Sequence, residues 1–264
     1  MAASRPFGSV ITRDCITTPR WRTSSEVLVM MQFYNVSECS FWCIYDALTC
    51  QDHDATVYRS DLKNLDNDEW LNDNNISFLY EYLEHSYLNE SKKADKVVLL
   101  RPSMAYLLLH TEDPKSLKEV LPPLDKARFI FLPINDNPDV RAIEGGAHWS
   151  LLVIGVADKC ALYYDTMEGS NLNVSVKTTK QLGHLLNKSF QFFCVPTPQQ
   201  VNMSDCGVLV CEITALLLSR LIESNENDKV DLSLENIAFV AAAGRTFILT
   251  VIMELISAQA KGTI

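Results

Sequence analysis

The pattern of apolar and polar positions predicts one compact α+β unit between about residues 56 and 264. Apolar residues at i, i+3 and i+4 spacing follow the polar run 72–75 and predict a helix. Ser103 is expected to cap a second, short helix ending at Leu109, and the Leu- and Ala-rich stretch 207–222 predicts a third. Runs rich in β-branched and aromatic residues predict four strands, at 128–134, 148–154, 160–165 and 190–195.

Two of these strands are expected to form a hairpin, because the two-residue gap Asp158-Lys159 suggests a tight turn between them. At the C-terminal end, residues 237–256 are nearly all apolar, which by length alone would permit a membrane span. Arg245, Gly244 and Glu254 interrupt this stretch and would be costly in lipid. A buried pair of helices broken at Ala243-Gly244 is therefore the expectation, with no membrane contact.

Residues 1–55 differ in character from the rest and are expected to form an N-terminal extension, either disordered or loosely packed. The first 25 residues contain four Arg, one acidic residue and eight Ser or Thr, a composition with some likeness to a transit peptide. A disordered leader is the simpler interpretation. With no secretory signal at its start, the chain is expected in the cytoplasm, the nucleus or both.

Net charge and cysteine content limit which classes of partner and cofactor the chain is expected to bind. A net charge of -10 argues against nucleic acid, whose phosphates require a basic surface, and favours a basic protein or peptide as partner. Eight cysteines in 264 residues are too few for a disulfide scaffold. A possible metal-binding group lies near the N-terminus and comprises Cys39, Cys43, Cys50 and His53. Its spacings lack the paired short loops of usual zinc sites, so neither a metal nor another cofactor is expected.

Three separate segments contain residues suited to thiol catalysis. Cys206 stands where a loop enters a predicted helix, and the positive end of a helix dipole favours a thiolate. His148 begins a predicted strand after Gly145-Gly146, and Asp165 ends the strand expected to pair with it. Such a carboxylate would orient the imidazole of a catalytic base. Taken singly, each has a structural alternative: a buried small residue, a core histidine and a turn residue. We also interpret Gly207 as a point where substrate backbone approaches closely.

Four blocks resemble the signature of the Ulp/sentrin-specific protease family, in family order. They are Trp70-Leu71-Asn72-Asp73, His148-Trp149-Ser150-Leu151-Leu152-Val153, Tyr164-Asp165-Thr166 and Gln200-x-Asn202-x-x-Asp205-Cys206-Gly207. The resemblance implies a papain-like fold, with a central mixed β-sheet flanked by helices and the nucleophile at a helix N-terminus. It also implies His148, Asp165 and Cys206 as a catalytic triad and Gln200 as a donor to the oxyanion.

The same resemblance implies an activity and a mode of substrate selection. Members cut after the C-terminal Gly-Gly of a ubiquitin-like modifier, and Trp70 and Trp149 would roof a tunnel that admits only glycine. Residues 51–90 contain ten acidic and two basic side chains, a balance of -8, so Asp73 and its neighbours would attract the arginine near such a tail. A solvated acidic helix face is the alternative for the neighbours.

Within the family, the segments 134–137 and 145–153 resemble the deneddylase branch, which acts on Nedd-type modifiers and their protein conjugates. The chain is expected to act as a monomer. Two alternatives stay open, a SUMO-specific protease with the same residues and a module that binds a modifier without cutting it. An acyltransferase with a similar Cys-His pair is a remoter third. The intact set of four polar residues favours an enzyme over a binding module.

Overall fold

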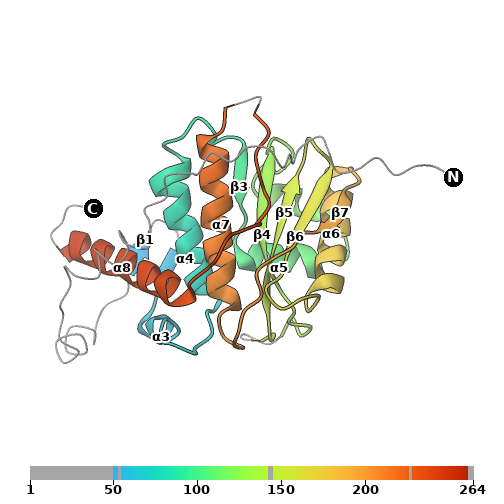
Figure 1. The fold of residues 1–264 in the computed structure, drawn as a ribbon. Helices are drawn as coiled ribbons and strands as arrows, with labels where there is room; N and C mark the ends of the chain where they lie inside the picture. Colours follow the sequence, from blue (N-terminus) through green and yellow to red (C-terminus); the bar gives the residue numbers. More distant parts are fainter. Residues whose placement is uncertain (1–49, 53–54, 142–144, 226–227, 261–264) are drawn as a thin grey trace.

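The computed structural model describes residues 50–52, 55–141, 145–225 and 228–260. The predicted N-terminal extension lies almost entirely outside these ranges, as do Cys39, Cys43 and His53. The described chain forms an α+β fold in which helices cover both faces of one mixed sheet (Figure 1). A short hairpin of β1 (Cys50–Asp52) and β2 (Ala55–Val57) lies beside this unit, so regular structure begins before the predicted boundary at residue 55.

The main sheet has five strands in the order β3-β4-β5-β6-β7. The outer pairs β3–β4 and β6–β7 are parallel, and the inner pairs are antiparallel. All seven residues of the central strand β5 are buried, as expected for a strand covered on both faces. The strands are β3 (Val97–Leu99), β4 (Phe129–Asn135), β5 (Trp149–Gly155), β6 (Cys160–Tyr164) and β7 (Gln191–Cys194).

Strands β5 and β6 form the predicted hairpin, with Gly155 paired to Cys160. The connection is longer than the dipeptide picked from the sequence and takes in the four residues between these two. Lys159 adopts a left-handed conformation with φ of 51° to close it. The register pairs Leu151 with Tyr164, so the residue before β5 and the residue after β6 come to the same end of the sheet.

Alternate residues of β5 contribute to two apolar cores. Leu151 and Val153 face α4 and α7, while Leu152 and Ile154 face α5 and α6. Figure 1 shows α4 and α7 side by side over one face of the sheet, with α8 beyond them. The helices are α3 (Arg59–Lys63), α4 (Asp73–Leu83) with its π-helical extension (Glu84–Leu88), α5 (Pro102–His110), the 3-10 turn Pro114–Glu119, α6 (Leu172–Leu186), α7 (Cys206–Glu223) and α8 (Ala241–Ala260).

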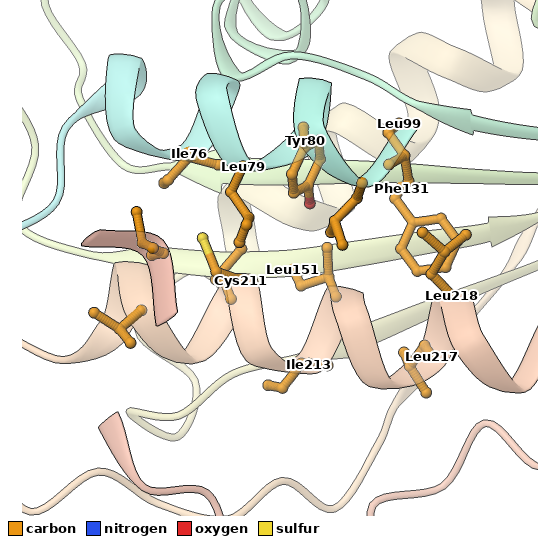
Figure 2. Packing of buried hydrophobic residues seen from close by; sticks show 14 of the residues in the cluster. Ile76, Leu79, Tyr80, Leu99, Phe131, Leu151, Cys211, Ile213, Leu217 and Leu218 are labelled. Carbon is orange, nitrogen blue, oxygen red and sulfur yellow. The ribbon is translucent and has the colours of Figure 1, made fainter. Parts of the chain in front are cut away.

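Side chains from α4, α7 and the sheet interdigitate in the first core (Figure 2). Tyr80 of α4 and Phe131 of β4 are fully buried there. The hydroxyl of Tyr80 forms a hydrogen bond of 2.9 Å with Oγ1 of Thr214 on α7, which satisfies a polar group that would otherwise be costly inside an apolar core. This contact fixes α4 and α7 side by side. Asp73 and Cys206, the first residues of these two helices, therefore rest on the same packed core.

Two expectations about helices are wrong, and one helix was not predicted. Helix α5 begins at Pro102 after Arg101, so Ser103 is not its cap; the fixed φ of proline suits the first helical position. Helix α6 was not predicted, since its Val, Thr and Gly residues have low helix propensity and tertiary packing outweighs that preference. The C-terminal stretch forms one continuous helix, α8, instead of a pair broken at Gly244.

Gly244 is needed for packing and does not break α8. A Cβ at this position would lie 2.7 Å from Cγ1 of Val208 and 3.1 Å from Cδ of Glu212, both on α7. Glycine thus allows α7 and α8 to cross closely.

By length and composition, α8 is the one helix in the described part of the chain that would suffice to cross a membrane, and 33% of that stretch is buried in the protein.

The same crossing buries a carboxyl group at an energetic cost. Burial, and secondarily the charge of Asp205, raises the pKa of Glu212 to about 7, and its Oε2 has no hydrogen-bond partner among the described residues. A carboxyl whose pKa is higher in the folded state destabilises the fold once it ionises. The free energy of unfolding should therefore fall as pH rises from about 4.5 to about 7.

Glu212→Gln should remove this penalty. We expect the variant to be more stable than the parent by roughly 2 kcal/mol at pH 8 and by much less at pH 5. Urea unfolding at the two pH values measures the difference. A gain of equal size at both would show that Glu212 does not titrate in this range.

Candidate active site

Cys206 is the first residue of α7 and lies at the positive end of an 18-residue helix. Its side chain is only 1% exposed and packs in the first core near the start of β5. The helix is as predicted, but the thiol is more deeply enclosed than a loop-to-helix junction suggests. A dry site of this kind strengthens every electrostatic interaction with the sulfur.

Strand pairing brings the predicted imidazole and carboxylate together. His148 directly precedes β5 and Asp165 directly follows β6, so the antiparallel register places both at one end of the sheet. Nε2 of His148 lies 2.5 Å from Oδ1 of Asp165, and both side chains are buried. This geometry fixes the orientation of the ring, as a general base requires.

The Asp165 carboxylate is held by several donors. Met167 donates its backbone N–H to Oδ1 at 2.9 Å, and the backbone N–H of Asn171 and the Tyr163 hydroxyl donate to Oδ2. Burial works against ionisation, but these hydrogen bonds, with that of His148 the largest, hold the pKa of Asp165 below its ordinary value. The group is therefore a carboxylate at neutral pH.

The protonation of His148 follows from its neighbours. Burial lowers its pKa, but the hydrogen bond with Asp165, the nearby Cys206 thiol and the charges of both raise it to about 9. Nδ1 is buried and has no hydrogen-bond partner within the described ranges, so it is the ring nitrogen left for the thiol. This arrangement places the imidazole to exchange a proton with the sulfur of Cys206.

Asn171, which sequence reasoning missed, ties the site together. It is fully buried at the start of α6, and its Nδ2 donates to the carbonyl oxygens of Ile134 and His148, each at 3.1 Å. Its backbone N–H reaches the Asp165 carboxylate. One residue therefore links the end of β4 to both members of the His-Asp pair. An Asn just before an unrecognised helix gave no signal in the sequence.

Gln200 lies in the loop before α7 and is joined to the segment after Asp165. Thr166 donates its hydroxyl to Oε1 of Gln200 at 2.7 Å, and the backbone N–H of Gln200 donates to the Thr166 carbonyl. Nε2 of Gln200 donates to the Asn202 carbonyl at 2.7 Å, which uses one of its two hydrogens. The two loops border a hollow of about 280 Å³, lined by Thr166, Met167, Glu168, Gln199, Gln200, Val201, Asn202 and Met203.

The predicted substrate contacts differ in their exposure. Trp149 is buried, and its indole N–H donates to the Leu71 carbonyl at 3.0 Å. Trp70 is 43% exposed in the segment that leads into α4, and Asp73 is exposed in the first turn of that helix. Of these three side chains, Trp70 and Asp73 are accessible to a partner, and a roofing role for either tryptophan remains a prediction.

Gly207 has a structural reason that differs from the one inferred from the sequence. A Cβ at this position would lie 2.8 Å from Cβ of Leu71 and 3.4 Å from Cδ1 of Trp149. Leu71 and Trp149 already fill the space beside this residue, so α7 can pack against the segment around Leu71 only with glycine at position 207.

Within the described residues, no group of three or more His, Cys, Asp or Glu side chains is placed to hold a metal ion.

A buried thiol at a helix start, beside an imidazole oriented by a carboxylate, defines a cysteine hydrolase site of the papain-like type. The model of the Ulp1 protease family, C-terminal catalytic domain, matches residues 69–241. The chain belongs to this family.

Relatives in two organisms support this assignment. NEDD8-specific protease 2 of Schizosaccharomyces pombe is 36% identical over 208 residues, which cover 78% of this chain and 50% of that protein. Probable sentrin-specific protease 8 of Dictyostelium discoideum is 32% identical, over 70% of this chain and 80% of its own length. The chain spans about half the length, or less, of the first curated relatives it matches.

Among solved structures, the yeast Ulp1 protease domain in complex with SMT3, a SUMO orthologue, has the same fold. The TM-score is 0.57 at 22% identity, with 83% of this chain and 96% of that chain covered. The expected central mixed sheet with flanking helices and a helix beginning at the cysteine is thus confirmed.

Proposed function

We propose that this chain is a thiol protease that hydrolyses the bond after the C-terminal Gly-Gly of a Nedd-type ubiquitin-like modifier. The observation that supports it most strongly is the contact between His148 and Asp165 at 2.5 Å, with the Cys206 thiol beside the same ring. A module that only bound a modifier would not need a protonated imidazole next to a thiol in a dry site.

The mechanism starts from the thiolate of Cys206 and the imidazolium of His148. The sulfur attacks the carbonyl carbon of the terminal glycine, and the carbonyl oxygen becomes an oxyanion stabilised by Gln200 and the backbone N–H of Cys206. His148 gives its Nδ1 proton to the departing amine, the C–N bond breaks and a thioester forms. His148, now neutral, removes a proton from water, whose oxygen attacks the thioester carbonyl carbon. The C–S bond breaks, which regenerates the Cys206 thiolate beside the imidazolium and releases the modifier with a free terminal carboxyl group.

Selection of the modifier follows from access to the sulfur and from surface charge. A thiol this enclosed favours a tail without side chains. Trp70 precedes Leu71 in the sequence, and the indole N–H of Trp149 donates to the Leu71 carbonyl. Exposed Asp73 and the acidic segment 51–90 would attract an arginine-containing tail. The preference for Nedd-type over SUMO-type modifiers is supported by the names of the relatives, several of which are NEDD8-specific proteases.

Gln200→Ala should lower kcat by about 10²–10³-fold with little change in KM, because the oxyanion forms only along the reaction path. Gln199→Ala is the matched control: its side chain also contacts this region, through the Asp165 carbonyl and the Glu168 N–H, but lies one residue out of register. Steady-state hydrolysis of a modifier fusion measures both. Equal losses in the two variants would contradict the assignment of the donor to Gln200.

The proposed substrate is tested by offering two amide-linked fusions in parallel, one with a Nedd-type and one with a SUMO modifier. We expect cleavage after Gly-Gly of the Nedd-type fusion at least about tenfold faster. Faster cleavage of the SUMO fusion would establish the alternative substrate, and binding without cleavage of either would establish a binding module. Thioester transfer to an added amine in place of hydrolysis would indicate an acyltransferase.

A further inference from the structure

Helix α8 places a buried guanidinium between two segments that are far apart in sequence. The Arg245 side chain is 4% exposed and anchored by hydrogen bonds to both. Nη1 donates to the carbonyl oxygens of Asn64 (2.8 Å) and Asp66 (3.0 Å), and Nη2 donates to those of Glu69 (2.7 Å) and Ser204 (3.3 Å) and to Oδ1 of Asp205 (3.0 Å).

On one side these bonds fix the backbone beside the exposed tryptophan. The Glu69 carbonyl, just before Trp70, accepts from Arg245, and the Leu71 carbonyl, just after it, accepts from the indole N–H of Trp149. The peptide group before Trp70 and the one after Leu71 are therefore held by buried donors, while the Trp70 side chain is 43% exposed. Arg245 supplies one of the two supports.

On the other side the bonds fix the entrance to α7. Ser204 and Asp205 immediately precede Cys206, and the Asp205 carboxylate is held at Oδ1 by Arg245 and at Oδ2 by Nδ2 of Asn202 at 2.9 Å. The Asp205 carbonyl accepts the backbone N–H of Leu209, which starts the hydrogen-bond ladder of α7. Movement of Asp205 would therefore move the thiol.

The chemistry of arginine suits this position. A guanidinium has a planar fork of donors and no acceptor, stays charged across the working pH range, and can reach several carbonyl oxygens at once. Lysine offers one nitrogen in their place. The close crossing of α8 over α7 at Gly244 brings Arg245, the next residue, to the end of α7 that begins with Cys206.

We propose that Arg245 is a positioning residue that holds the Trp70 segment against the start of the nucleophile helix, so that the substrate tail and the thiol keep a fixed position relative to each other. This inference rests on the proposed protease function for its catalytic consequence. It adds to the site a residue that touches neither the reacting atoms nor the triad.

Arg245→Lys in the full chain tests the proposal by kinetics and by amide hydrogen exchange. We expect kcat/KM on the Nedd-type fusion to fall by about tenfold or more, through both a higher KM and a lower kcat, since small misplacements are costly in catalysis. Amides in 65–72 and 203–209 should exchange faster, while those of β4 to β6 keep their protection. Arg220→Lys is the matched control, because Arg220 also donates to two carbonyls, those of Asp231 and Ser233, at the other end of α7.

The control should leave kcat/KM within about threefold of the parent and accelerate exchange only around 229–234. Asp205→Asn is the second variant if Arg245→Lys fails to fold; it should lower kcat about fivefold or more with KM within twofold. The proposal is overturned if Arg245→Lys stays within threefold of the parent, if Arg220→Lys loses as much, or if Asp205→Asn keeps the parental kcat. A parent that cleaves no fusion would refute the protease function, and the exchange pattern would still decide whether Arg245 holds the two segments.

Discussion

Replacing Cys206 with serine should abolish hydrolysis of the modifier fusion, with a loss of about 10⁴-fold or more in kcat. The sulfur is the proposed nucleophile, and a serine hydroxyl in its place would be a much weaker nucleophile, because it stays protonated without a strong adjacent base. The hydroxyl would fill nearly the same space, so the fold and the affinity for the free modifier should persist.

Cys194→Ser provides the control for this result, because Cys194 is a free thiol exposed on β7. That variant should keep parental activity. Single-turnover hydrolysis of the Nedd-type fusion, with modifier affinity measured separately, distinguishes loss of chemistry from loss of binding. Residual hydrolysis above about 1% in Cys206→Ser would contradict nucleophilic catalysis by this thiol.

Asp165→Asn should have the second-largest effect, lowering kcat at pH 7 by about 10³–10⁴-fold. The amide can still accept a hydrogen bond, but it no longer stabilises the imidazolium. The carboxylate hydrogen bond is the largest of the influences that raise the pKa of His148. Its removal should lower that pKa, so less imidazolium is present to pair with the thiolate and to protonate the departing amine.

The pH profile gives this prediction a direction that instability alone would not produce. In the parent, kcat/KM should fall as pH rises through about 9, where His148 loses its proton. In Asp165→Asn the same decline should begin at lower pH. A pH-rate profile measured on both proteins with one fusion tests this shift, and superimposable alkaline limbs would contradict the electrostatic role of Asp165.

The same pair links stability to pH. The pKa of His148 is higher in the folded state than its ordinary 6.5, so its pairing stabilises the fold fully below about pH 6.5, and this contribution is lost as pH rises through about 9. The carboxylate of Asp165, whose pKa is lowered, adds stability above its ordinary range and loses it in acid. The parent should therefore become less stable between pH 7 and pH 9.5, and Asp165→Asn should show a smaller decline.

Much of the site follows from local patterns together with the resemblance. His148 and Asp165 could be placed together because both lie at the ends of β-rich runs joined by a short turn, and an antiparallel hairpin leaves few alternatives for their register. Cys206 was recognisable from its place at the start of a long apolar helix. These features depend on residues close to one another in the chain.

The supporting residues could not be found in this way. Arg245 contacts backbone 181 residues away at Asn64, and no periodicity reports such a contact. Asn171 precedes a helix whose β-branched residues hid it. Gly207 was interpreted as a point of close substrate approach and Gly244 as a helix break, but each is required where another element approaches closely. The shape of the neighbour decides the role of a glycine, and the neighbour is specified by the tertiary fold.

The most direct test of the account is to react the full chain with a Nedd-type modifier whose terminal glycine carries a thiol-reactive group, and to map the attachment site by mass spectrometry. We expect one modifier per chain, bonded to the sulfur of Cys206, at least about tenfold slower reaction when the probe carries SUMO, and no product when His148 is replaced by alanine. Attachment to another cysteine, or no attachment while the chain remains folded, would contradict the central claim that this buried thiol is the nucleophile for a Gly-Gly tail.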